Sequence, residues 1–286
     1  MSPGPICTGS PRAGTIHARP RSIAASVSCA PPALVASRSG DRRFDWTDRG
    51  TWDTALEGVR AAYLVPFDGE QLTRPFVERA VELGVQRLVL LSGRGVDVPG
   101  YVDTRNPAAQ THIDGEAAVR DLGIEWTIVR PGWFAQNFDE GFFRDAVLAG
   151  ELRLPAGDGA ATFVDAEDIA AVAVAALTED GHDRQIYELS GPRAVTIAEA
   201  AAEISAATGR EIRYVPLSPE DFVVELTASG WSPGDAADFA EAMAPLRRDL
   251  DSHVSDGVRR ALGREPRDFS EYAKAAAAAG AWQGVS

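Results

Sequence analysis

Few side chains in this sequence have both the type and the setting for acid–base chemistry. His112 lies in a stretch with helical character, and an imidazole there could donate a proton to a substrate or hydrogen-bond to it. Glu116 follows one helical turn later, at the i,i+4 spacing that could let it orient the ring. The alternative is that both side chains belong to a solvated helix surface. Residue type and spacing alone leave both alternatives open.

Other common catalytic arrangements are missing. A Tyr-x-x-x-Lys pair, in which the lysine lowers the tyrosine pKa, cannot be formed because the only lysine, Lys274, lies two residues after Tyr272. Tyr101 and Arg105 have this spacing, but arginine keeps its charge and the pair falls in an expected loop. No Gly-x-Ser-x-Gly motif, Cys–His pairing or carboxylate pair indicates hydrolysis.

The composition narrows the range of partners. The 286 residues carry a net charge of −14, and an acidic surface repels phosphate backbones and anionic membranes, so we expect no direct nucleic-acid partner and no membrane association. No apolar run approaches the roughly 20 residues of a membrane span. The two cysteines cannot form a disulfide framework, which suits a reducing compartment and predicts a cytoplasmic protein. The four histidines lack metal-ligand spacing, so no metal site is predicted.

Strands and helices alternate in the part of the chain that must position these residues. Ala61–Val65, Arg87–Leu91 and Trp126–Val129 are short apolar runs that predict strands buried on both faces. Helical periodicity separates them, over residues 72–81 and about 107–122. This spacing predicts right-handed crossovers and a doubly wound, mainly parallel α/β sheet of the Rossmann type.

The second half of the chain is richer in helix. Asp165 and Asp168 bracket the start of an Ala/Val-rich helix, and Thr196 with Glu199 forms a capping box. We expect three segments: an atypical stretch over residues 1–40, a nucleotide-binding domain over 41–190, and a smaller helix-rich cap over 191–286. The cap is expected beside the carboxyl ends of the strands, where such sheets bind ligands.

The first 40 residues differ from the rest. They contain no Asp or Glu, four arginines, both cysteines and six of the 18 prolines. Pro20 and the pair Pro31-Pro32 interrupt any helix there. Three interpretations compete: a targeting peptide, a disordered tail, or a segment garbled by a shifted reading frame or a misassigned start, which we favour.

A set of ordered segments from about residue 36 to 275 resembles the NmrA-like branch of the atypical short-chain dehydrogenases, and within it the ergot-alkaloid reductases (agroclavine dehydrogenase and festuclavine synthase). The segments are Arg43-Phe44-Asp45-Trp46, Tyr63-Leu64-Val65-Pro66, Val89-Leu90-Leu91-Ser92, Trp126–Phe138, Gly157-Asp158-Gly159, Phe163–Ala170, Tyr187–Pro192 and Gly263–Phe269.

The resemblance implies a dinucleotide, NADP(H) rather than NAD(H), lying across the strand ends. Ser37 and Arg38 would follow the second strand, where a guanidinium can pair with a 2′-phosphate. The other cofactor-binding residues that it implies are Asp45 and Trp46 at the adenine, Leu64, Val65 and Pro66 on the adenosine side, Ser92 and Gly93 beneath the nicotinamide ribose, and Pro131 at the nicotinamide. For Leu64, Val65 and Pro131 the alternative is packing at strand ends, and for Arg38 it is an exposed arginine.

The glycine loop is where this sequence departs from the family. Gly9 and Gly14 resemble remnants of a Thr-Gly-x-x-Gly-x-x-Gly loop, but Pro11 and Arg12 intrude and no helix pattern follows. Such glycines allow the backbone to approach the pyrophosphate. The departure puts phosphate binding by this chain in doubt.

The resemblance implies an NADPH-dependent reductase that transfers hydride to a small organic substrate with a C=N or activated C=C or C=O bond. Trp133, Phe134 and Asn137 would line the substrate pocket. His112 falls where related proteins carry a His or Lys near the nicotinamide, so the resemblance makes it the predicted catalytic residue. The cofactor supplies the reducing chemistry, so an iminium substrate would need no general acid. The alternative is a non-catalytic NADP sensor that acts through a protein partner. A homodimer is compatible with the sequence, which does not determine the oligomeric state.

Overall fold

The centre of the molecule is a sheet of four parallel strands in the order β3-β4-β5-β8. The computed structural model describes residues 36–37, 42–67, 70–101 and 107–283. The four strands are Ala61–Leu64 (β3), Arg87–Leu91 (β4), Glu125–Pro131 (β5) and Gln185–Leu189 (β8). Three of them lie at the positions that the apolar runs predict.

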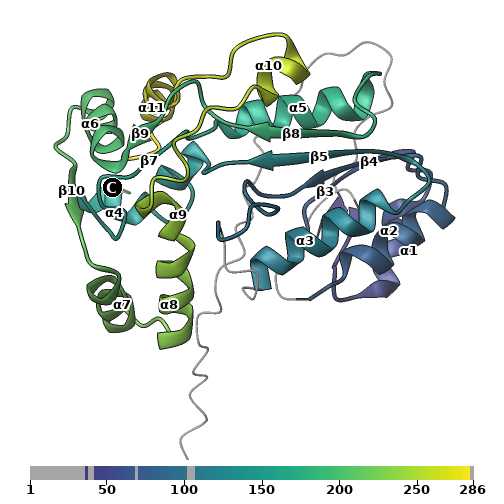
Figure 1. The fold of residues 1–286 in the computed structure, drawn as a ribbon, viewed down its shortest axis with the longest axis horizontal. Helices are drawn as coiled ribbons and strands as arrows, with labels where there is room; N and C mark the ends of the chain where they lie inside the picture. The colour runs from purple at the N-terminus through teal and green to yellow at the C-terminus, as the bar shows by residue number, and fades with distance from the viewer. Residues whose placement is uncertain (1–35, 38–41, 68–69, 102–106, 284–286) are drawn as a thin grey trace, which may run out of the picture.

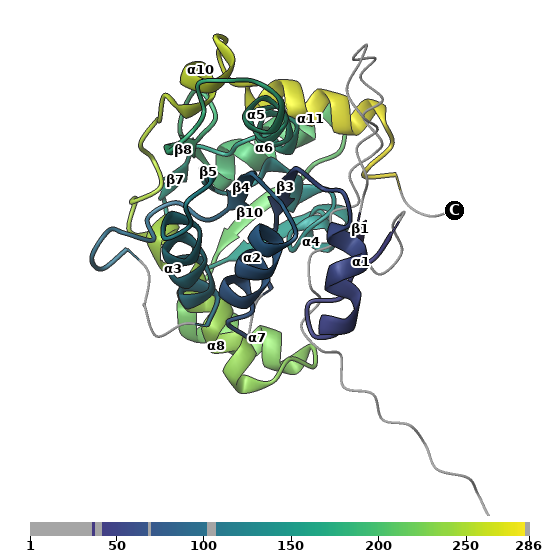
Figure 2. The same ribbon diagram turned by 90° about the vertical axis from the view of Figure 1, so that its right-hand side faces the viewer.

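Helices cover both faces of this sheet (Figure 1). On one face lie α1 (Trp52–Leu56), α2 (Thr73–Glu82) and α3 (Pro107–Arg120), and on the other lie α5 (Ala166–Thr178) and α10 (Gly257–Leu262). Figure 2 shows the strands between these two layers. The predicted doubly wound Rossmann fold is therefore confirmed.

Alternation along the strands explains why both faces need cover. Leu88 and Leu90 of β4 are fully buried in the core with α2 and α3, whereas Val89 between them is buried in the core with α5. Successive side chains of a strand point to opposite faces, so a strand without polar residues must be covered on both.

Two short strands form a separate parallel pair, β1 (Ala36–Ser37) with β2 (Arg42–Arg43), next to α1. The 3-10 helix η1 (Arg49–Thr51) then leads into α1. Trp46 and Trp52 pack against Phe76 of α2 with ring centroids 4.9 and 5.3 Å apart. Among the described residues, β3 pairs only with β4, so the β1–β2 pair and the four-stranded sheet are separate sheets.

A second hydrophobic core lies beside the carboxyl ends of the strands (Figure 1). Strand β5 runs towards it through the 3-10 helix η2 (Ala135–Phe138), and the rings of Phe138, Phe163 and Phe269 meet at its centre. The other elements in this region are α4 (Arg144–Ala149), β6 (Glu151–Leu154), β7 (Ala160–Ala161), β9 (Val195–Thr196), α6 (Ile197–Thr208), β10 (Arg213–Pro216), α7 (Pro219–Ala228), α8 (Pro233–Ala242), α9 (Ala244–Arg247) and α11 (Phe269–Ala278).

The chain crosses between the two cores several times. Residues 135–163 contribute to the second core. The chain then returns to the first part of the molecule, where α5 covers the sheet and β8 is its last strand. After a second passage through the second core, α10 packs on α5 and β8. The second core therefore combines residues from both sides of position 190. None of the helices in the described ranges is both long and apolar enough to span a bilayer.

Local capping signals place the helix starts. The Asp165 side chain accepts a hydrogen bond from the Glu167 N–H at the start of α5. Thr196 and Glu199 form both hydrogen bonds of a capping box at the start of α6, and Gly209 ends that helix with a φ of 70°. Both caps are confirmed.

Candidate functional site

The carboxyl ends of β4 and β5 bring two of the expected cofactor segments side by side. The Ser92 N–H donates to the Val129 carbonyl at 2.8 Å, and the Arg94 N–H donates to the Pro131 carbonyl at 3.1 Å. The chain segments carrying Ser92, Gly93 and Pro131 are thus held together as an extension of the sheet.

A buried ion pair between a strand and a helix holds a residue of this edge in place. Arg130 of β5 donates from Nε and Nη2 to the two carboxylate oxygens of Glu116 on α3, each at 2.7 Å. Arg130 is 6% exposed and Glu116 is 4% exposed. The Ser92 hydroxyl donates to the same Glu116 carboxylate at 2.7 Å, so the orientation of Ser92 depends on an ion pair between a helix and a strand.

His112 lies next to the Ser92–Gly93 turn. A Cβ atom placed on Gly93 would lie 3.4 Å from His112 Cδ2, so the imidazole edge packs against this turn. His112 is half-buried. The structure therefore brings the predicted catalytic histidine together with two of the expected cofactor residues, while the Glu116 carboxylate is engaged by Arg130 and Ser92.

The expected substrate residues follow β5 directly. Trp133 stacks on Phe143 with ring centroids 6.1 Å apart, and its indole N–H donates to Asp251 at 3.1 Å. Phe134 packs against the core under α5. Asn137 lies one turn later in η2, and its Oδ1 would be 2.9 Å from a Cβ atom on Gly141.

The expected adenosine side is more dispersed. At the end of β3, Leu64 is buried in the core, whereas Val65 is 52% exposed and Pro66 is half-buried. Asp45 accepts hydrogen bonds from the Thr47 N–H and hydroxyl, and the Trp46 ring packs on Phe44 and Phe76. Val65 is thus the residue of this group that offers an apolar surface, while Asp45 also closes a turn.

Three expected cofactor residues, Gly9, Gly14 and Arg38, lie outside the described residues. Ser37 is the last residue of β1, a strand of which the structure describes only the backbone. The roles of these residues at the pyrophosphate and the 2′-phosphate stay predictions from the sequence.

A cavity of about 310 Å³ opens at the segment that follows β4. Three parts of the chain line it: the loop that follows Gly93, the end of β8 and the segment between α9 and α10. The lining residues are Arg94, Gly95, Val98, Pro99, Gly100, Tyr101, Glu188, Arg248, Leu250 and His253. Concave sites with a few convergent polar groups are the usual form of small-molecule sites.

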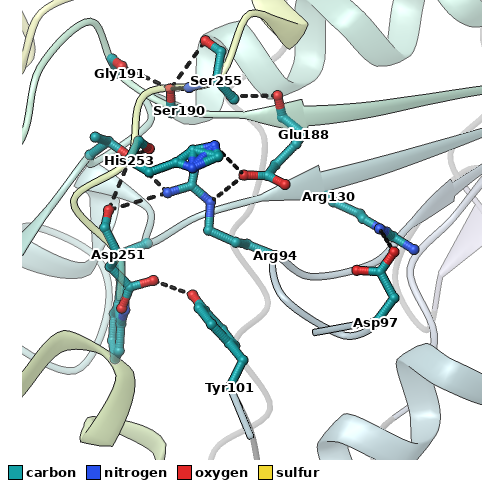
Figure 3. Close-up of polar contacts among 12 residues, drawn as sticks. Arg94, Asp97, Tyr101, Arg130, Glu188, Ser190, Gly191, Asp251, His253 and Ser255 are labelled. Carbon is teal, nitrogen blue, oxygen red and sulfur yellow. Dashed lines mark hydrogen bonds and ion pairs between the residues drawn. The ribbon is translucent and has the colours of Figure 1, made fainter. Parts of the chain in front are cut away.

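Figure 3 shows the polar groups at the base of this cavity. Arg94 forms an ion pair with Glu188 at 3.0 Å and donates to the Thr162 hydroxyl at 2.9 Å, and His253 lies 3.4 Å from the same Glu188 oxygen. The arginine is 8% exposed, so its charge is balanced at a buried position.

A second group of polar contacts meets at Asp251, which is 1% exposed. The Tyr101 hydroxyl donates to its Oδ1 and the Trp133 indole to its Oδ2. Burial raises the pKa of Asp251 above its ordinary value, although the two hydrogen bonds act in the opposite direction. Burial, and then the negative charge of Asp251, raise the pKa of Tyr101 above its ordinary value near 10.

Sequence reasoning did not single out the residues around this cavity, apart from Tyr101. Arg94, Asp251 and His253 come from distant parts of the chain and lie in none of the segments that carry the family resemblance. Glu188 and Arg130 lie in such segments, Tyr187–Pro192 and Trp126–Phe138, but these segments do not indicate a partner for either side chain. The described residues contain no cluster of His, Cys, Asp or Glu side chains that could hold a metal ion.

A half-buried carboxylate beside the second core offers a test by pH. Burial raises the pKa of Asp139 to about 6, and the Tyr272 hydroxyl donates to it at 2.8 Å. A raised carboxyl pKa means that folding favours the protonated form, so stability is lost as pH rises from about 4 to about 6. Asp139→Asn is therefore expected to be more stable than the parent by about 1–2 kcal/mol at pH 7.5 and equally stable at pH 4.

Urea denaturation at the two pH values measures this difference. Asp145→Asn, with a side chain that is 95% exposed, is the control and should change neither value. A difference for Asp139→Asn that is the same at both pH values would contradict the assignment.

Several of the expected cofactor residues lie along one edge of the sheet. Ser92, Gly93 and Pro131 lie on adjacent strand ends beside His112, and the exposed Val65 follows β3 on the same edge of the parallel sheet. This is the edge at which doubly wound sheets hold nucleotides.

Known proteins resemble this chain over most of its length. Residues 42–180 match a family model described as NAD(P)H-binding. The NAD(P)H azoreductase of Xenophilus azovorans is 36% identical over 252 residues, which cover 86% of this chain and 84% of that protein. The agroclavine dehydrogenase of Claviceps fusiformis is 29% identical over 84% of this chain and 87% of its own.

A solved structure agrees with these relatives. The NADPH-dependent quinone oxidoreductase of Escherichia coli in complex with NADPH superposes with a TM-score of 0.70 and is 26% identical, over 82% of each chain. The fold, the ordered motifs and the relatives lead to one assignment. The chain belongs to the NAD(P)H-binding family of these relatives, which include agroclavine dehydrogenase and festuclavine synthase, and is an NAD(P)H-dependent oxidoreductase of small molecules.

Proposed function

We propose that the chain uses NADPH to reduce a small organic molecule at a C=N bond or at an activated C=C or C=O bond. The observation that carries this proposal is the meeting of Ser92–Gly93, Pro131 and His112 at one edge of the sheet, next to a cavity of about 310 Å³. The relatives include an azoreductase, a quinone oxidoreductase and a clavine dehydrogenase, which supports a conjugated, unsaturated substrate.

Each part of the site has a proposed task. Bound NADPH supplies a hydride to the substrate. Ser92, held by Glu116, hydrogen-bonds to the nicotinamide ribose, and Gly93 lets the ribose approach the backbone. Pro131 gives the nicotinamide ring a rigid apolar surface.

The remaining residues act on the substrate or on the rest of the cofactor. Trp133, Phe134 and Asn137 shape the substrate side and exclude water, and His112 orients the substrate by a hydrogen bond. Residues 41–190 hold the cofactor and 191–286 form most of the cap, joined by α4 and β6. For the whole protein we propose a cytoplasmic location, either as a monomer or as a homodimer, and no nucleic-acid partner.

Titration of the protein with NADPH and with NADH, followed by tryptophan quenching, tests cofactor use. We expect saturable binding with a Kd for NADPH about tenfold or more below that for NADH, because Arg38 can pair with the 2′-phosphate. Arg38→Ala should remove most of this preference. Equal affinities for the two cofactors would contradict the role of Arg38.

Turnover is tested with an azo dye, a quinone, an enone and a cyclic iminium, by following loss of NADPH absorbance. Reduction of at least one of them is the expected result. Tight NADPH binding without reduction of any would instead support the alternative of an NADP sensor. If the folded protein does not bind NADPH, we would infer that residues 1–40, which carry the expected phosphate loop, do not bind the pyrophosphate.

A further inference from the structure

Tyr101 lines the cavity of about 310 Å³ and forms with Asp251 an acid–base pair that the proposed function does not use. Reduction of an enone or an azo bond adds a hydride to one atom and leaves an electron pair on the other, which must take up a proton. Reduction of an iminium ion only adds a hydride, because the product amine is already neutral. The two substrate classes therefore differ in their need for a proton donor.

The loop after β4 is shaped to hold the Tyr101 ring at this place. A Cβ atom on Gly95 would lie 2.1 Å from the Tyr101 ring, and Gly95 has a φ of 74°. Two successive turns, Val98 N–H to the Gly95 carbonyl and Tyr101 N–H to the Val98 carbonyl, bring the ring back over the glycine. Glycine is needed here both for the backbone conformation and for the space that the ring occupies.

The Tyr101 hydroxyl meets Asp251, which comes from a segment 150 residues later in the chain. Tyr101 lines the cavity, whereas Asp251 lies behind it and is almost completely buried. A residue that lines the cavity is therefore hydrogen-bonded to a buried carboxyl group (Figure 3). The Trp133 indole donates to the other oxygen of that carboxyl group.

We propose that Tyr101 is the proton donor for substrates whose reduction requires a proton, and that Asp251 is a positioning residue that holds the hydroxyl and returns a proton to it; this inference rests on the proposed reductase function. When the Asp251 carboxyl is protonated, its O–H donates to the Tyr101 oxygen, and the Tyr101 hydroxyl proton is then free to turn from the carboxyl to the substrate. The Tyr101 Oη–H bond breaks as this proton passes to the substrate atom that received the electron pair. The Asp251 carboxyl then gives its proton to the tyrosine oxygen and is protonated again from solvent. No further reactant is needed.

The surroundings of Asp251 allow it to hold a proton. Arg94 from the β4–α3 loop favours the ionised form, whereas burial and the nearby Asp249 favour the protonated form. Glu188 and His253, at the base of the cavity, and Arg248, at its rim, are the other charged or titratable groups that face this place. Burial outweighs Arg94, so the pKa of Asp251 is raised.

The ratio of enone turnover to iminium turnover tests the proposal. Tyr101→Phe is expected to lower this ratio about 100-fold, within the usual range for loss of a general acid. Tyr214→Phe is the matched control, because the Tyr214 hydroxyl donates to the Gly157 carbonyl in the second core, and its ratio should equal that of the parent. An equal loss on both substrates would show a structural role for Tyr101 and overturn the proposal.

His112 is the competing donor, and the same assay separates the two. If His112→Gln lowers the ratio and Tyr101→Phe does not, the proton comes from His112 and the proposal is wrong. If the parent protein binds NADPH but reduces neither substrate, the proposed function fails and this inference fails with it. Unchanged NADPH binding and thermal unfolding of Tyr101→Phe show that the variant is folded.

A measurement without cofactor tests Asp251 separately. Because the Trp133 indole donates to Asp251, ionisation of the carboxyl should change Trp133 fluorescence as the pH is raised. The pH-dependent part of the emission that Trp133→Phe removes should also be absent from Asp251→Asn. Enone turnover should fall as the pH rises through the same midpoint, and iminium turnover should not. A Trp133 signal that persists in Asp251→Asn would overturn the role of Asp251.

Discussion

Replacing Arg130 by methionine is expected to lower the free energy of unfolding by about 3 kcal/mol, at the lower end of the range for removing one partner of a buried ion pair. Glu116 would then stay buried without its two 2.7 Å hydrogen bonds from Arg130. Arg120 still contacts the carboxylate at 2.6 Å, but its side chain is 41% exposed and can neutralise the charge only in part. Urea denaturation at pH 7 measures the loss.

Two further variants make this result specific. Arg74→Met removes an ion pair with Asp121 in which both side chains are exposed, so it should cost less than about 1 kcal/mol. The double variant Arg130→Met with Glu116→Leu removes both buried charges and should recover most of the stability. If the double variant is as unstable as Arg130→Met, the loss reflects packing around Arg130 rather than an uncompensated carboxylate.

The same substitution should also affect the cofactor. The Ser92 hydroxyl is oriented by Glu116, so a displaced carboxylate leaves Ser92 without a fixed acceptor. A several-fold increase in the Kd for NADPH is expected for Arg130→Met in the folded protein, and none for Arg74→Met.

Gly257→Ala is expected to destabilise the protein by about 3 kcal/mol, at the upper end of the range for overpacking. Gly257 begins α10 where this helix crosses β8, and a Cβ atom there would lie 2.0 Å from the Glu188 carbonyl oxygen. The two atoms nearest to the added methyl group belong to the Glu188 backbone, so relief requires a shift of α10 or of β8. Since Glu188 pairs with Arg94 at the cavity, turnover should fall as well.

Gly123→Ala provides the matched control for this prediction. Gly123 lacks a positive φ, and a Cβ atom on it meets nothing within 4 Å. The alanine should leave stability unchanged or raise it by up to about 1 kcal/mol, because the unfolded chain loses freedom. Equal effects of the two substitutions, measured by urea denaturation, would show that the α10–β8 contact can relax at little cost.

Much of the fold could be predicted from local patterns. The apolar run Arg87–Leu91 requires cover on both faces of a strand, and α3 and α5 provide it. The capping box at Thr196 and Glu199 placed the start of α6 to the residue, because these hydrogen bonds join neighbours in sequence.

The candidate site could be predicted only along single segments. Ser92, Gly93 and Pro131 follow strands, and parallel strands end at one edge, so their meeting follows from the fold class. The sequence suggested Glu116 as a partner of His112, because the i,i+4 spacing of a helix can be recognised in a sequence. It could not suggest Arg130, since a contact between α3 and β5 depends on how helix and sheet pack.

The sequence by itself therefore determined the alternation of strands and helices, the doubly wound class and the family, all of which follow from period, caps and ordered motifs. Only the tertiary structure decided that Arg130 and Glu116 form a buried pair, and that Tyr101, Trp133 and Asp251 meet beside a cavity. The physical reason is that each contact joins different elements of the fold. Arg130 and Glu116 are 14 positions apart but lie on a strand and a helix, and Asp251 is 118 and 150 positions from Trp133 and Tyr101. Such contacts leave no local period, because the packing of whole elements chooses the partner.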